Sequence, residues 1–236
     1  MKKIILGTTA AMLMAAGTAH AAFIMYLDDA STAGIDRIVQ DDTLAGVLTG
    51  IGLTTTADME SKTGAVLYTG GFGSFLMNVT VGLSKPVLDG PGNIFDLNSV
   101  SVSGSAGSLT IGLTDTDFYK KGAGFLNFSI GGTTDGTVTA SAYMDASNVE
   151  FGTGTLLGSM SYTGGGMDSG FGYNSSGTAI NSTDPYSLTL VTTIKHANES
   201  DTTSFDAAVV PEPSILALIS LGLVGLGFAG RRKQGK

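Results

Sequence analysis

The sequence of 236 residues predicts an all-β fold, an antiparallel β-sandwich or jelly roll, between two short terminal segments of different character. Apolar and polar residues alternate with a period of two in several runs rich in Thr, Val, Ile and aromatics, which is typical of strands buried on one face. Clusters of Gly, Asn, Asp and Pro separate these runs. Helical spacing between them is almost absent, which favours an antiparallel sandwich over a sheet with crossover helices.

The first 21 residues are typical of a secretory signal peptide. Two lysines form a basic n-region, an apolar h-region runs from Ile4 to Thr18, and Ala19 and Ala21 form an A-x-A cleavage site. We expect the exported chain to begin near Ala22.

The part of the chain between the two terminal segments is called the body. Its predicted strands are defined by their inward-facing residues. In chain order these are Phe75, Met77, Val79, Val81 and Leu83; Leu109, Ile111 and Leu113; Leu126, Phe128 and Ile130; Val138, Ala140, Ala142 and Met144; and Tyr186, Leu188, Leu190, Thr192 and Ile194. We expect at most one helix, near Asp41 to Leu48. The stretch from Ser161 to Asn181 is rich in Gly, Ser and Thr and is expected to form a long mobile loop.

The C-terminal segment combines a proline motif, an apolar run and a basic end. Pro211, Glu212 and Pro213 disfavour helix and favour an extended peptide. The 18 residues from Pro213 to Gly230 carry no charge. As a helix they would span about 27 Å, near the lower limit for a bilayer core of about 30 Å. The basic residues after them fit the positive-inside rule and predict stop-transfer charges on the cytoplasmic side. These are Arg231, Arg232 and Lys233.

Composition limits what the body can do. It contains no cysteine, which excludes disulfides and thiol chemistry. Half of the 12 Lys and Arg residues lie in the two terminal segments, so the body has 19 Asp and Glu against 6 Lys and Arg, a net charge of −13. Such a body should be repelled by nucleic acid and by anionic membranes. We expect three parts: residues 1–21, the signal peptide; residues 22–208, a β-sandwich ectodomain; and residues 209–236, a tail with one transmembrane helix.

The tail closely resembles the sorting signal of the PEP-CTERM proteins of Gram-negative bacteria. The resemblance rests on residues 209–214 (VVPEPS), the apolar run and the final Arg-Arg-Lys, in this order behind a signal peptide. It implies recognition by an exosortase, a membrane-embedded cysteine enzyme, during a transient stay in the inner membrane. The tail would be removed, and the body delivered to the cell surface or the extracellular matrix, typically in bacteria that make exopolysaccharide.

The body also resembles a group of uncharacterised PEP-CTERM ectodomains. The similar segments are residues 80–86 (TVGLSKP), 113–118 (LTDTDF) and 202–206 (TTSFD). This resemblance brings no known activity. It implies one domain that runs up to the tail.

Candidate catalytic and metal-binding residues are few. His196 is the only histidine after the signal peptide, and no G-x-S-x-G is present, so a Ser-His-Asp hydrolase and a His-based zinc site are disfavoured. We expect His196 to be an exposed residue at a strand end. Paired carboxylates leave a glycosidase open, but most of these Asp residues occupy apparent turns. Asp115 and Asp117 could reach one calcium ion, which needs 6–8 oxygen ligands. We therefore expect no cofactor, with calcium at this pair as the one alternative.

These observations predict a non-enzymatic surface or biofilm-matrix protein with a structural or adhesive role. The alternative is a carbohydrate-binding module that acts on exopolysaccharide, because sandwiches and jelly rolls often carry lectin domains. The chain has no Trp for a sugar platform, so tyrosines would have to serve, although half-buried strand or turn positions are their default. These are Tyr26, Tyr119, Tyr143, Tyr162 and Tyr173.

Overall fold

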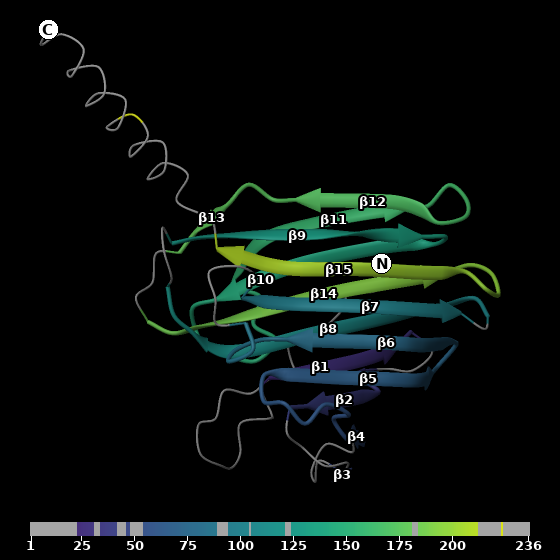
Figure 1. The fold of residues 1–236 in the computed structure, drawn as a ribbon, viewed down its shortest axis with the longest axis horizontal. Helices are drawn as coiled ribbons and strands as arrows, with labels where there is room; N and C mark the ends of the chain where they lie inside the picture. The colour runs from purple at the N-terminus through teal and green to yellow at the C-terminus, as the bar shows by residue number, and fades with distance from the viewer. Residues whose placement is uncertain are drawn as a thin grey trace, which may run out of the picture.

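The computed structural model describes residues 23–30, 34–41, 46–47, 54–88, 94–103, 105–120, 124–180 and 184–211, together with Leu223. The prediction of an all-β antiparallel sandwich is confirmed, because the described residues form fifteen strands in two stacked sheets (Figure 1). The described strand pairs are antiparallel, with one exception, the parallel pair of β2 and β4.

The eight-stranded sheet has the order β11-β10-β14-β8-β1-β2-β4-β3. Its strands are β1 (Ile24–Asp29), β2 (Arg37–Gln40), β3 (Gly46–Val47), β4 (Thr54–Thr56), β8 (Gly107–Phe118), β10 (Thr137–Asp145), β11 (Thr155–Thr163) and β14 (Tyr186–His196).

The seven-stranded sheet has the order β12-β9-β15-β7-β6-β5, and the short β13 pairs with β9. Its strands are β5 (Ala65–Phe72), β6 (Phe75–Leu83), β7 (Phe95–Ser103), β9 (Phe125–Thr134), β12 (Ser169–Asn174), β13 (Thr178–Ala179) and β15 (Thr202–Pro211).

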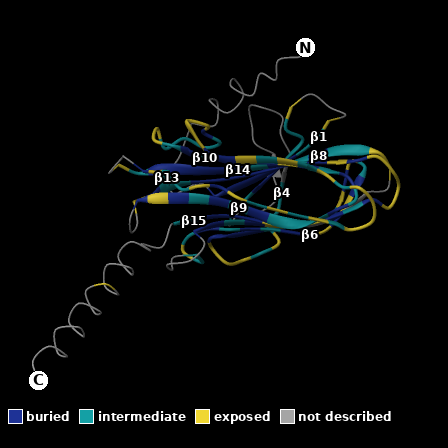
Figure 2. Cartoon of the chain, turned by 90° about the horizontal axis from the view of Figure 1, so that it is seen from above, coloured by how far each residue is buried: buried dark blue, intermediate teal, exposed yellow. Residues whose placement is uncertain are grey.

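The core lies between the two sheets, where the buried residues of both layers face one another (Figure 2). The alternation predicted for β8, β9, β10 and β14 is confirmed, because the inward residues of these strands are buried. A second, smaller cluster covers part of the outer side of the eight-stranded sheet. It consists of Ile24, Tyr26 and Ile38, with Ile35 and Phe151 packed against them.

The predicted inward face of β6 is correct only in its first half. Phe75 and Met77 are buried as expected, but the register with β7 shifts between Met77 and Val79. A β-bulge adds one residue and exchanges the two faces of the strand beyond it. Thr80 is therefore buried, where its Oγ1 lies 2.8 Å from Ser99 Oγ, and the expected inward positions of Val81 and Leu83 are wrong.

The stretch from Ser161 to Asn181 is not one long loop. β11 continues to Thr163, and β12 adds a strand to the opposite sheet. Phe171 and Tyr173 pack against the core two residues apart, but the residue between them and the residue before Phe171 are glycines. The alternation was therefore hidden, because glycine carries no side chain that marks the outer face. The helix expected near Asp41 to Leu48 is also wrong over Gly46–Val47, which form β3.

Most of the two terminal segments lies outside the described residues. This holds for Ala19 and Ala21, for Glu212 and Pro213, and for the stop-transfer charges Arg231, Arg232 and Lys233. Within the part of the chain that is described, no helix has the length and apolar character needed to cross a bilayer.

Candidate functional site

The outer side of the eight-stranded sheet presents hydroxyl groups in rows that run across its strands. The alternation that turns apolar residues inward places Ser or Thr outward at many of the intervening positions. In one row, Ser161 of β11, Thr139 of β10, Thr193 of β14 and Thr110 of β8 are direct cross-strand neighbours, followed by Asp28 of β1. The row therefore crosses five neighbouring strands.

Several of these hydroxyls contact one another. Thr110 Oγ1 lies 3.0 Å from Thr193 Oγ1, and Thr139 Oγ1 lies 3.2 Å from Ser161 Oγ. One level along the strands, Thr137 Oγ1 lies 3.1 Å from Thr163 Oγ1. Each such pair stabilises the sheet by about 0.2–1 kcal/mol. A hydroxyl has one donor and two acceptor lone pairs, so each member retains capacity for an external partner.

We call this surface the hydroxyl face. It consists of Thr110, Thr137, Thr139, Ser141, Ser159, Ser161, Thr163 and Thr193, all exposed or partly exposed.

A loop between β10 and β11 bounds the hydroxyl face at one end. Asp145 closes this loop, accepting hydrogen bonds from the backbone N–H groups of Ser147 and Gly154 at 2.7 and 3.1 Å. The loop lies over the sheet, because Phe151 N donates to Thr114 Oγ1 at 3.0 Å and Ser187 Oγ donates to Val149 O at 2.7 Å. The sheet beneath the loop is therefore shielded, and the hydroxyl face beyond it stays open.

Asp28 ends the row in an acidic environment. Partial burial raises its pKa, the neighbouring carboxylates of Asp36 and Asp29 act in the same direction, and together they bring the pKa to about 6. Protonation of Asp28 near pH 6 would convert the end of the row from an acceptor into a donor.

Asp115 lies inside the protein. It is in phase with Leu109, Ile111 and Leu113, and its side chain is 1% exposed. Asp115 Oδ2 lies 2.7 Å from Lys85 Nζ and accepts a hydrogen bond from Ser84 Oγ at 2.5 Å. Burial raises the pKa of Asp115, although the Lys85 ammonium and the hydrogen bonds partly oppose this shift.

Asp117 has a different partner. Its backbone is left-handed at φ 59°, its N–H donates to Asn148 Oδ1 at 2.8 Å, and its Oδ1 accepts from Asn148 Nδ2 at 2.6 Å. The two carboxylates proposed for calcium thus engage separate groups. In the described part of the chain, no three His, Asp or Glu side chains gather in a way that could hold a metal ion. Calcium at Asp115 and Asp117 stays a prediction.

His196 is buried, so the expectation of an exposed strand-end residue is wrong. It continues the inward phase of Thr192 and Ile194 and is 1% exposed. Its Nε2 lies 2.7 Å from Thr203 Oγ1, and its Nδ1 has no hydrogen-bond partner among the described residues. Burial lowers the pKa of His196, and Asp201 and Asp135 only partly oppose this. The neutral imidazole is therefore the form that the fold favours.

We expect the contribution of His196 to the free energy of unfolding to fall as the pH drops below about 6.5, because the imidazole of the unfolded chain then binds a proton that buried His196 does not. The stability that the neutral imidazole contributes is fully present above about pH 6.5. It is lost as the pH falls toward the lowered pKa of His196 in the folded protein. Asp28 has the opposite effect on stability. Because its pKa is raised on folding, its contribution to the free energy of unfolding grows as the pH falls from about 6 toward the ordinary pKa of an aspartate. The free energy of unfolding in urea should therefore be measured at pH 7 and at pH 5 for two proteins. One is the Asp28→Asn variant, and the other is the same variant with His196→Gln added. An equal loss in both proteins would contradict the assignment.

The tyrosines considered as sugar platforms differ in position. Tyr26 is buried, with its ring over Gly112 and 5.1 Å from that of Phe151. Tyr162 and Tyr173 are half-buried and stack or tilt against Phe171 and Phe128, which fits the default expectation. Tyr119 is exposed. Tyr143 is half-buried and lies in phase with Thr137, Thr139 and Ser141, at the end of the hydroxyl face.

The proline motif begins inside the fold. Pro211 is the last residue of β15 and pairs with Leu126 of β9. Val209, two residues earlier, is fully buried in the core. The strand therefore runs three residues into the segment assigned to the tail, and the structure places no spacer between the sandwich and Pro211.

Comparison with known proteins gives a family match at the tail and distant likenesses for the body. No curated protein matches the chain. Among solved structures, TmCBM61 in complex with beta-1,4-galactotriose is 10% identical, with a TM-score of 0.34 over 61% of this chain and 92% of its own. The CBM36-1 domain of a xylanase from the hindgut metagenome of Trinervitermes trinervoides is 14% identical, with a TM-score of 0.30 over 64% and 97%. Tailspike protein 4 of bacteriophage CBA120 is 10% identical, with a TM-score of 0.35 over 62% and 19%.

The PEP-CTERM protein-sorting motif matches residues 209–233, which confirms the resemblance drawn from the sequence. This motif indicates export and exosortase-dependent sorting to the cell surface. The chain carries a PEP-CTERM protein-sorting motif that begins within β15, the last described strand of an all-β sandwich.

Proposed function

We propose that this protein is a structural or adhesive component of the cell surface or extracellular matrix, to which its tail delivers it after passage through the inner membrane. The hydroxyl face carries the proposal. Rows of hydroxyls across β11, β10, β14 and β8 form an extended polar surface of the kind that can lie along a polyhydroxylated polymer.

The spacing of the rows supports weak binding at many points. Neighbouring strands lie about 4.8 Å apart, so the hydroxyls repeat at short intervals across the face. A single hydrogen bond adds only about 0.5–1.5 kcal/mol. Several such contacts along one polymer chain add up, because each contact holds the next close to its partner. This suits adhesion to exopolysaccharide in a matrix.

Removal of two central hydroxyls should weaken this adhesion. Thr139→Val with Thr193→Val keeps the branched shape and the strand preference but removes neighbouring hydroxyls of β10 and β14. We expect at least about a threefold smaller fraction of protein to sediment with insoluble exopolysaccharide, because two contact points are lost at about 0.5–1.5 kcal/mol each. Thr133→Val, on the other sheet beside Ser204, is the matched control. Sedimentation that is equal for the double variant and the control would rule out the hydroxyl face as the adhesive surface.

A carbohydrate-binding module is the second candidate, and the position of Tyr143 favours it. A tyrosine ring at the end of the hydroxyl face could stack on one sugar, while the hydroxyls bind the next. Such a module should show binding of soluble oligosaccharides in calorimetry, and the Tyr143→Ala variant should lose this binding. Adhesion to insoluble polymer without oligosaccharide binding would instead favour the structural role.

A further inference from the structure

The strand β12 forms an open edge of the seven-stranded sheet. Among the described strands it pairs only with β9. β11, the corresponding edge of the eight-stranded sheet, lies on the same side of the sandwich (Figure 1). This side therefore presents two strand edges, and a strand edge offers N–H and C=O groups to another chain.

The ladder shows which groups of β12 face outward. Ser175, directly after the strand, donates its N–H to Phe128 O at 2.8 Å. In an antiparallel pair, bonded and non-bonded positions alternate. Tyr173 and Phe171 thus bond to β9, whereas the N–H and C=O groups of Gly170, Gly172 and Asn174 point away from it.

Little shields these outward groups. Gly170 and Gly172 carry no side chains, and a Cβ placed on either would meet no atom closer than 4.0 Å. The opposite edge of the same sheet differs. On β5, Leu67 donates its N–H to Asp58 Oδ1 at 3.0 Å, and Leu67 O accepts from Met59 N at 3.4 Å. Among the residues that the structure describes, one edge is thus covered by the protein's own chain, and the other is left open.

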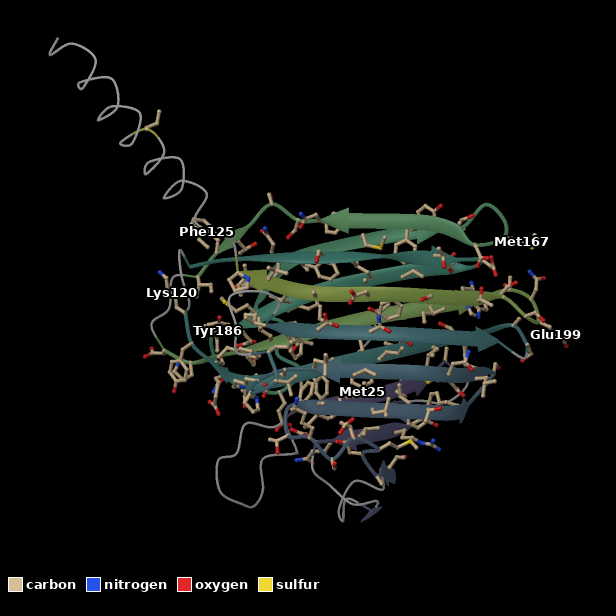
Figure 3. All side chains as sticks on the ribbon, in the orientation of Figure 1. Met25, Lys120, Phe125, Met167, Tyr186 and Glu199 are labelled. Atoms are coloured by element: carbon tan, nitrogen blue, oxygen red, sulfur yellow. The ribbon has the colours of Figure 1, made fainter. Side chains whose placement is uncertain are left out.

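Charge favours contact on the open side. Residues 151–183 contain one charged residue, Asp168, although the body as a whole carries a net charge of −13. Apolar side chains are also exposed there. Leu156 of β11 is 49% exposed, and Met167, in the turn between β11 and β12, is 94% exposed (Figure 3). Two copies of this acidic protein would repel least if they met along this side.

We propose that the β12 strands of two copies pair antiparallel about a twofold axis and join their seven-stranded sheets into one continuous sheet. Such an interface uses the same surface of both copies. With the axis at Gly172, each Gly172 lies opposite its counterpart, and Gly170 lies opposite Asn174 of the second copy. This inference goes beyond the proposed adhesive role, because it does not depend on polysaccharide.

A cysteine at Gly172 tests the pairing directly, because the chain contains no cysteine of its own. Directly opposed residues in an antiparallel ladder have Cα atoms about 5.5 Å apart, within the range of about 4.4–6.8 Å that a disulfide spans. The full-length Gly172→Cys protein should form a disulfide-linked dimer on mild oxidation. Gly71→Cys is the matched control, an exposed glycine of β5 on the opposite edge, where a Cβ also meets no atom. Equal cross-linking of both variants, or cross-linking of Gly172→Cys only to other proteins, would overturn the proposal.

A second pair of variants tests the backbone contacts themselves. Gly172→Pro removes an N–H that points away from β9, and proline is tolerated on edge strands in this orientation. Gly172→Ala keeps the N–H and fills the same open space. We expect the dissociation constant of the full-length dimer, measured by analytical ultracentrifugation, to rise at least about tenfold for Gly172→Pro relative to Gly172→Ala.

Far-ultraviolet circular dichroism and thermal unfolding confirm that both variants are folded. A monomeric wild-type protein at every concentration, or equal dimerisation of the two variants, would refute the pairing. Sedimentation with exopolysaccharide is measured separately on Thr139→Val with Thr193→Val, so failure of dimerisation and failure of adhesion remain distinguishable.

Discussion

Lys85→Met is expected to lower the free energy of unfolding by about 3–5 kcal/mol, because it leaves an unpaired carboxylate buried. Asp115 is 1% exposed, and the Lys85 ammonium at 2.7 Å is the cation that compensates its charge. Lys85 Nζ also donates to Thr116 O and lies 4.3 Å from the centre of the Phe118 ring. Urea unfolding at pH 7 measures the loss.

Two further variants separate charge from packing. Asp115→Asn added to Lys85→Met removes the uncompensated charge and should recover a large part of the loss. Lys195→Met, an exposed lysine of β14, should change stability little. The penalty of Lys85→Met should shrink as the pH falls, because burial already raises the pKa of Asp115 and loss of the cation raises it further. A penalty that is independent of pH would show that lost packing, rather than charge, explains the effect.

Gly132→Ala is expected to destabilise the protein by about 3 kcal/mol or more, through overpacking against backbone that cannot move freely. Gly132 lies in β9 opposite Phe205 of β15. A Cβ at this position would overlap the carbonyl oxygen of Ser204 and lie 2.8 Å from Phe205 Cα. The clash would push apart two central strands of the seven-stranded sheet. The midpoint of urea unfolding reports this change.

Gly131 is the matched control for this prediction. It is the preceding residue of the same strand, but a Cβ there would lie 3.6 Å from the nearest atom, Phe171 O, which is ordinary contact. Gly131→Ala should therefore leave stability unchanged or raise it slightly, because alanine reduces the conformational freedom of the unfolded chain. Equal destabilisation by Gly131→Ala and Gly132→Ala would contradict the explanation by close strand approach.

Period-two alternation predicted the core well where each strand keeps a constant phase. Leu109, Ile111 and Leu113 define the inward face of β8, and the same phase places Asp115 inside. The phase of β14 places His196 inside in the same way. Both burials could have been predicted by extending the pattern across polar residues, instead of ending it at the last apolar residue.

Other features depend on information that no local pattern contains. The partner of Asp115 is Lys85, thirty residues earlier in the chain, and only the pairing of distant strands brings them together. The bulge near Asn78 changes the phase of β6 without a glycine or proline to mark it. The hydroxyl face combines residues from β8, β10, β11 and β14, so it requires the register between strands in addition to the sequence of each strand.

The position of β15 has a consequence for the order in which the protein can be completed. β15 is the last described strand of the chain, yet it lies between β9 and β7. Until Thr202–Pro211 is available, the seven-stranded sheet consists of two separate pieces, β5 to β7 on one side and β9 with β12 on the other. A chain that crosses a membrane with its N-terminus leading could therefore not complete the seven-stranded sheet until almost all of the body has emerged. Such a chain depends on non-local strand pairing, which forms slowly. The edges of β7 and β9 stay unpaired and exposed until β15 inserts between them.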